Sequence, residues 1–195
     1  MEALKFDRLY TYRDYVTWDD KNRYELIDGV VYMMSSPSRL HQKILTELLR
    51  QLSNFLVGKS CEVYPAPFDV RLHGNGDKET TVVQPDIVVV CETTKLDDKG
   101  CNGAPDMVIE ILSPSNAKHD TIRKFSKYLE AGVKEYWVVD PERQTVFVHI
   151  LENGKYVVNG YEEPAVIDVT VLEGCQLNLN VVYNLPNLGV RGEIN

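Results

Sequence analysis

Two acidic residues lie in segments that otherwise have the composition of buried β-strands. Asp86 directly precedes four apolar residues, and Glu110 lies inside the apolar segment 107–112. A charged side chain is almost never buried without a partner or a metal ion. If the two strands pair, both carboxylates converge. Together with a backbone carbonyl, for which we take that of Ile111, and with water molecules, they would form an all-oxygen site of the kind that Mg²⁺ or Mn²⁺ prefers.

A lysine on the next predicted helix can add a positive charge to this pair. Asp120, Lys124 and Tyr128 are spaced four residues apart and therefore share one stripe of the helix. A lysine beside a metal-bound water can assist its deprotonation or hold the charge that develops on a phosphate. These groups suit phosphodiester hydrolysis. The alternatives are a structural Glu110–Lys124 ion pair, a turn carboxylate at Asp86 and a solvated acid in the first helical turn at Asp120.

The elements that must position these residues follow from hydrophobic spacing and turn signals. Asp28-Gly29 suits the turn of a hairpin, and apolar residues from Leu40 onward have helical spacing as far as Gly58. A second helix is expected from residue 115 or 116 to about 131. Strands are expected at 23–27, 30–34, 61–72, 81–91, 107–112, 134–140 and 145–151, with shorter ones at 156–158, 166–171 and 176–179. The order predicts a mixed α/β (α+β) fold with a central sheet, and residues 136–139 are expected in its core.

Several motifs in this order resemble the Uma-two family (domain of unknown function 820), which is assigned to the PD-(D/E)xK superfamily of restriction endonucleases. The resemblance covers about two-thirds of the chain, from Glu25 to Leu151. It is carried by residues 24–29, 36–37 with His41, 85–86, 110–115, 120–124 with Tyr128, and 132–141. It implies a restriction-endonuclease-like αβββαβ core with a central mixed sheet flanked by helices. It also implies a divalent metal on Asp86 and Glu110, and hydrolysis of DNA.

The chain departs from the superfamily signature at Leu112, where the pattern expects a lysine. The resemblance implies that the lysine has moved to the following helix, which makes Lys124 the candidate and Lys127 a weaker one. Glu25 and His41 also match family positions and could complete a metal shell or position a water. Asp106, about 13 Å along the strand from Glu110, is too distant to share a metal and is expected to be structural.

Composition limits the remaining possibilities. The chain has 195 residues and a net charge of −8, so an attractive field for nucleic acid over the whole surface is excluded, and a nucleic-acid site must be a local basic patch. Candidate cations for such a patch are Arg39, Lys43, Arg50, Lys118, Arg123, Lys124 and Lys127. The four cysteines match no zinc spacing and are expected to be free thiols.

We expect a single domain over residues 1–195, with its core at about 22–151 and C-terminal strands and a tail at 152–195. No apolar stretch is long enough to span a membrane, and the N-terminus lacks the pattern of a secretory signal, which predicts a cytoplasmic protein. The leading hypothesis is a Mg²⁺-dependent DNA endonuclease acting as a homodimer. The alternatives are a catalytically inactive DNA-binding or protein-interaction module of the same fold, and a hydrolase of another phosphodiester such as RNA.

Overall fold

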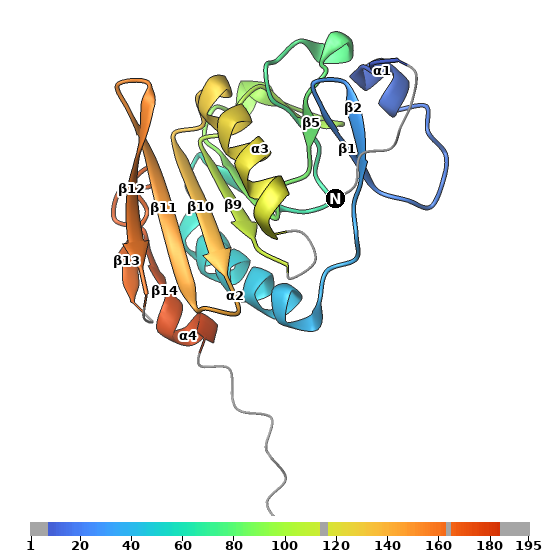
Figure 1. Cartoon of the computed structure of the whole chain (residues 1–195). Coiled ribbons are helices and arrows are strands. Elements are labelled where there is room, and N and C mark those ends of the chain that lie inside the picture. Colours follow the sequence, from blue (N-terminus) through green and yellow to red (C-terminus); the bar gives the residue numbers. More distant parts are fainter. Residues whose placement is uncertain (1–7, 114–116, 163–164, 184–195) are drawn as a thin grey trace, which may run out of the picture.

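The computed structural model describes residues 8–113, 117–162 and 165–183, and for residues 117–122 it describes the backbone alone (Figure 1). The helices are α1 (Tyr12–Tyr15), α2 (Arg39–Leu56), α3 (Ala117–Ala131) and α4 (Leu179–Tyr183), with 3-10 turns η1 (Gly76–Lys78) and η2 (Thr93–Lys95). The strands are β1 (Tyr24–Ile27), β2 (Val30–Met33), β3 (Glu62–Pro65), β4 (Val70–Arg71), β5 (Val82–Val83), β6 (Ile87–Val90), β7 (Leu96–Asp97), β8 (Gly100–Asn102), β9 (Met107–Ile111), β10 (Glu135–Asp140), β11 (Thr145–Glu152), β12 (Lys155–Tyr161), β13 (Val166–Asp168) and β14 (Gln176–Asn178).

The main sheet is mixed and has the strand order β12-β11-β10-β9-β6-β3. Its parallel pair is β9 and β10, which α3 connects, and the other neighbouring strands are antiparallel. Alternation along β9 sends Met107, Ile109 and Ile111 into the core beneath α2, whereas Val108 packs with Tyr128 of α3 on the opposite face. The predicted central mixed sheet flanked by helices is therefore confirmed (Figure 1).

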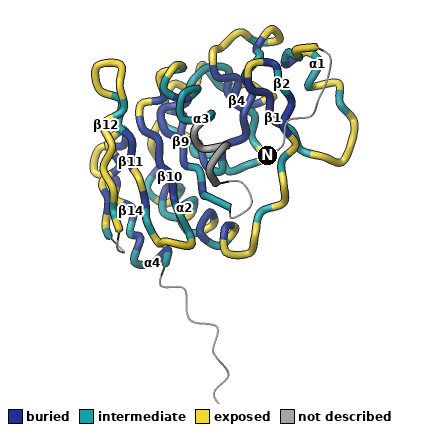
Figure 2. Tube along the Cα trace, viewed as in Figure 1, coloured by how far each residue is buried: buried dark blue, intermediate teal, exposed yellow. Residues whose placement is uncertain are grey.

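Helix α2 forms where the apolar spacing predicts it. The Ser38 hydroxyl accepts a hydrogen bond from the backbone N–H of His41 and so caps the helix. One face of the helix is buried against the main sheet through Ile44, Leu45, Leu48, Leu52 and Leu56. Figure 2 shows the same separation across the molecule, with buried strands in the centre and the exposed strand β12 at the rim. Because the cap and the buried face fix the helix, they also fix His41 in its first turn.

A second sheet, which the sequence did not predict, covers the face of the main sheet opposite α2. Its order is β2-β1-β5-β4-β8-β7, and its residues Ile27, Val70 and Val83 share a core with Val88 and Val108 of the main sheet. It arises because the predicted strands 61–72 and 81–91 each divide in two, giving β3 and β4, and β5 and β6. Proline has no N–H to give to a sheet, and Pro67 and Pro85 lie at the two breaks.

The expectation that all four cysteines are free thiols was wrong for two of them. Cys61 and Cys91 form a disulfide, while Cys101 and Cys175 are free and buried. The cause is the register of β3 and β6, which pairs Glu62 with Val90 and so places the two cysteines at the next opposed position. Sequence spacing could not reveal this pairing because it depends on which strands become neighbours.

The N-terminal segment forms an aromatic layer on the second sheet. Tyr12 of α1 is buried with Leu26 and Val31, and Tyr15 and Trp18 pack beside them. The predicted C-terminal strands are present as β12, β13 and β14, whereas residues 184–195, at the end of the predicted tail, lie outside the described residues. Among the described residues, no helix has the length and apolar content needed to cross a membrane.

The predicted hairpin of β1 and β2 turns at Asp28 and Gly29, both with positive φ, and we expect Gly29→Ala to destabilise the fold by about 2–3 kcal/mol. A Cβ at Gly29 would lie 2.8 Å from Cβ of Leu9 and 3.1 Å from the carbonyl oxygen of Tyr10. Gly58 has nearly the same φ, +74° against +76°, with no atom near its added Cβ. Gly58→Ala is therefore the matched control and should cost about 1 kcal/mol. Equal losses on urea unfolding would show that the contact with residues 9 and 10 contributes nothing.

Candidate active site

The two carboxylates predicted to converge lie beside each other where strand β6 begins and strand β9 ends. The antiparallel pairing of β6 with β9 sets Ile87 opposite Ile109, so Asp86 and Glu110 occupy the next opposed position. Oδ2 of Asp86 accepts a hydrogen bond of 2.7 Å from the backbone N–H of Ile111. The strand pairing thus delivers the arrangement that the sequence predicted.

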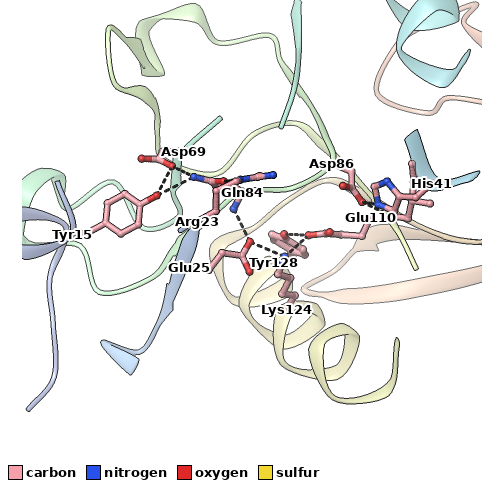
Figure 3. A network of polar contacts seen from close by, with 11 residues as sticks. Tyr15, Arg23, Glu25, His41, Asp69, Gln84, Asp86, Glu110, Lys124 and Tyr128 are labelled. Carbon is pink, nitrogen blue, oxygen red and sulfur yellow. Dashed lines mark hydrogen bonds and ion pairs between the residues drawn. The ribbon is translucent and has the colours of Figure 1, made fainter. Parts of the chain in front are cut away.

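His41 reaches Asp86 from the first turn of α2. Its Nε2 lies 3.1 Å from Oδ2 of Asp86, and the imidazole is buried (Figure 3). Burial lowers the pKa of His41, but the hydrogen bond to Asp86 and the charges of Asp86 and Glu110 outweigh it, so the pKa is raised. His41 and the Ile111 N–H therefore hold the same carboxylate oxygen from two sides.

Lys124 of α3 contacts one carboxylate from each of the two sheets. Its Nζ lies 2.8 Å from Oε1 of Glu25 in the second sheet and 3.0 Å from Oε1 of Glu110 in the main sheet. The hydroxyl of Tyr128, one turn further along α3, donates a hydrogen bond of 2.6 Å to the same Glu110 oxygen. The predicted helical stripe therefore does face the carboxylates, through Lys124 and Tyr128 (Figure 3).

Glu25 is the most deeply buried of the site's carboxylates. It is 0% exposed, and its Oε1 accepts a hydrogen bond of 2.7 Å from the backbone N–H of Gln84 as well as the contact from Lys124. Within the described part of the chain, its Oε2 has no hydrogen-bond partner. Because a buried carboxylate needs compensation, the positive charge of Lys124 is essential to this arrangement.

The electrostatic balance of the site is negative. Burial raises the pKa of Glu110; Lys124 opposes this shift, and the charges of Asp86 and Glu25 add to it, with a net rise to about 7. Burial and the charges of Glu110 and Glu25 raise the pKa of Tyr128 well above its ordinary value, so its hydroxyl remains a donor. A cation beside Asp86 and Glu110 would relieve this repulsion.

A pocket of about 120 Å³ opens onto these groups, and its lining includes Asp86, Glu110, Ile111, Lys124 and His41. The described residues contain no group of three or more His, Cys, Asp or Glu side chains arranged to hold a metal ion. Asp86 and Glu110 line the pocket together with Ile111 and the His41 imidazole, and carboxylate oxygens are hard ligands of the type that Mg²⁺ and Mn²⁺ take alongside several waters. The residues present therefore fit a divalent cation that keeps part of its water shell.

Other candidate residues lie elsewhere. Lys127 pairs with Asp28 and Glu130 at 2.9 Å each, and it is not among the residues that line the pocket with Asp86 and Glu110. Asp106 accepts hydrogen bonds from Lys134 and the Cys91 N–H, which confirms its structural interpretation. The predicted core strand at 136–139 is buried. The side chains of Lys118 and Asp120 lie outside the described residues. In the expected basic patch, Arg50 is paired with Glu47 and Arg123 lies over the ring of Tyr32.

Sequence reasoning missed a polar network behind the site. The side-chain oxygen of Gln84 accepts from Arg23, and its amide nitrogen donates to the Tyr15 hydroxyl and to Oδ1 of Asp69. The available signal was the polar Gln84 between apolar Val83 and Pro85. Its partners could not be found in the same way because they are 15 to 69 residues away in sequence.

The fold is similar to that of a solved structure. A crystal structure of a chain titled a putative nuclease of DUF820, from Anabaena variabilis, superposes with a TM-score of 0.72 at 21% identity, covering 89% of this chain and 97% of that one. An uncharacterized protein from Synechocystis sp. is 24% identical over 180 residues, covering 87% of this chain and 89% of the relative. The structural likeness shows a nuclease-like fold.

The Uma2 family model, described as "Putative restriction endonuclease", matches residues 12–180. The chain belongs to the Uma2 family, which confirms the resemblance found in the sequence. The match also extends beyond the motifs on which that resemblance was based, into the C-terminal strands.

Proposed function

We propose that this protein is a metal-dependent DNA endonuclease whose active site consists of Asp86, Glu110 and Lys124, supported by Glu25 and His41. The observation that carries the proposal is the convergence of three side chains on one pocket in a chain of the Uma2 family: Asp86 directly before β6, Glu110 in β9 and Lys124 in α3. Two carboxylates can hold a metal ion that activates a water, and a lysine can stabilise the charge that develops on a phosphate.

Asp86, Glu110 and the carbonyl of Ile111 would hold Mg²⁺ or Mn²⁺. The bound ion would lower the pKa of a coordinated water and offset charge on the phosphate. His41 and the Ile111 N–H orient Asp86 through Oδ2. Glu25 and Glu110 fix the ammonium group of Lys124 at the pocket, where it can orient the attacking water or hold the charge that develops on the phosphate.

Metal dependence is tested by titrating Mn²⁺ and Mg²⁺ calorimetrically into the wild type and assaying plasmid nicking on the same sample. We expect saturable binding and nicking that EDTA abolishes and added Mn²⁺ restores. A labelled RNA duplex run in parallel distinguishes DNA from another phosphodiester. Absence of both metal binding and nicking would contradict the proposal and favour an inactive interaction module of the same fold.

We also propose a homodimer, because a nuclease that cuts both strands of a duplex commonly works as a two-fold symmetric dimer with one active site for each strand. Sedimentation equilibrium tests this assembly, and a monomer at assay concentrations would contradict it. A cytoplasmic location and a single domain over the whole chain stay predictions.

A further inference from the structure

We propose that Arg23 binds a backbone phosphate of the nucleic acid and so positions the strand beside Asp86 and Glu110. This inference rests on the proposed nuclease function and adds to it a substrate-binding residue. Arg23 lines the same pocket as Asp86, Glu110 and Lys124, and it is half-buried there.

The local backbone aims Arg23 at the site. It directly precedes β1, and its carbonyl oxygen accepts a hydrogen bond of 2.8 Å from the N–H of Met34, which closes the β1–β2 hairpin. Side chains two residues apart in an extended segment share a face, so Arg23 projects on the same side as Glu25. The residue between them, Tyr24, instead packs with the aromatic layer of α1.

Gln84 holds the guanidinium in place without neutralising it. Nε and Nη2 of Arg23 lie 3.0 and 2.7 Å from the single side-chain oxygen of Gln84. The Gln84 amide nitrogen donates to Tyr15 and Asp69, so these two acceptors fix which end of the amide faces Arg23 (Figure 3). An uncharged partner anchors the side chain while leaving its full positive charge.

The remaining donors of Arg23 suit a phosphate. A guanidinium has five N–H groups, and the Gln84 contact uses two, which leaves the Nη1 end for another acceptor. None of the carboxylates in the described ranges forms an ion pair with Arg23, whereas Lys124 already bridges two of them. Because planar guanidinium groups bind phosphate oxygens in pairs, Arg23 is the pocket cation best placed to take a phosphate group.

A positive charge on Arg23 would also help an acidic protein to bind a negatively charged nucleic acid. The net charge of −8 and the carboxylates of the site repel a polyanion. A divalent cation would offset Asp86 and Glu110 at one place in the pocket, and Arg23 supplies a second, permanent positive charge in the same pocket. Together they would draw one strand into an otherwise acidic molecule.

The test measures binding of a fluorescein-labelled short DNA duplex by anisotropy, with Ca²⁺ in place of Mg²⁺, between about 50 and 200 mM salt. Arg23→Gln should weaken binding about tenfold and reduce the slope of log K against log salt by about 0.9, the value of one lost phosphate contact. Arg23→Lys keeps the charge but not the planar fork, and should retain the slope and recover part of the affinity. Arg143→Gln removes the same charge from an exposed position outside the pocket and is the matched control.

The outcomes separate this inference from the proposed function. If Arg23→Gln changes affinity and salt slope no more than Arg143→Gln does, while the wild type binds and nicks DNA, the role of Arg23 is overturned and the nuclease stands. If the wild type neither binds nor nicks DNA, both proposals are overturned. Should Arg23→Gln fail to fold by its melting curve, Arg23→Lys decides: weaker binding than wild type at an unchanged slope supports the phosphate contact, and wild-type affinity contradicts it.

Discussion

Glu110→Gln is expected to reduce metal-dependent plasmid nicking by about 10³-fold or more while leaving the fold as stable as that of the wild type or more stable. The loss of activity follows from removal of a proposed metal ligand, since a bound ion contributes several kcal/mol of transition-state stabilisation. Stability is retained because the amide keeps the size of the carboxyl group and an acceptor for Lys124 and Tyr128, and Glu25 still pairs with Lys124. The measurements are nicking rate, Mn²⁺ titration and melting temperature.

The pH dependence of stability gives this variant a second signature. The pKa of Glu110 is raised from 4.5 to about 7, chiefly by burial, so the folded state binds this proton more tightly than the unfolded chain. In EDTA, the contribution of Glu110 to stability therefore falls as pH rises from about 4.5 to about 7, and it stays constant above that range. Glu110→Gln should remove this fall.

Glu130→Gln is the matched control for Glu110→Gln, because it removes the same charge from an exposed position that pairs with Lys127. It should change neither nicking nor the pH profile. Full metal-dependent nicking by Glu110→Gln would rule out its carboxylate as a metal ligand. Glu110→Gln, purified in the same way as the wild type, also controls for a contaminating nuclease, because a contaminant would nick the plasmid in both samples.

The central residues of the site were predictable because they are acidic and lie in or directly before apolar strand segments. Asp86 and Glu110 are acidic residues at apolar strands, which predicted that each needs a partner, and the pairing of β6 with β9 supplies the convergence. The four-residue spacing of Lys124 and Tyr128 placed both on one helical face, and both contact Glu110. In these cases strand and helix geometry alone connects the sequence to the arrangement.

The parts that were not predictable depend on contacts between distant segments. Glu25 was a candidate only through the family resemblance, because its partner Lys124 lies on α3, nearly one hundred residues later. The second sheet exists because Pro67 and Pro85 interrupt segments whose composition is that of continuous strands. The Cys61–Cys91 disulfide follows from the register of β3 and β6, which no local pattern specifies.

Lys124→Met is expected to destabilise the protein by about 3–5 kcal/mol and to abolish nicking. The side chain of Lys124 is 6% exposed, and that of its partner Glu25 is 0% exposed, so the variant leaves a buried carboxylate without its cation. Removing one partner of a buried ion pair costs this much because the other charge stays desolvated. Urea unfolding measures the loss of stability, and the plasmid assay measures the loss of activity.

The comparison that separates a structural lysine from an active-site lysine is the double variant Glu25→Gln with Lys124→Met. Removing the buried charge together with its partner should restore much of the lost stability, because an uncharged amide costs less to bury than a carboxylate. If Lys124 acts on water or phosphate, nicking stays absent in this stabilised protein, whereas a purely structural ion pair would allow activity to return. Lys127→Met is the matched control: Lys127 lies on the same helix and pairs with exposed Asp28 and Glu130, so its loss should cost less than about 1 kcal/mol and leave nicking unchanged.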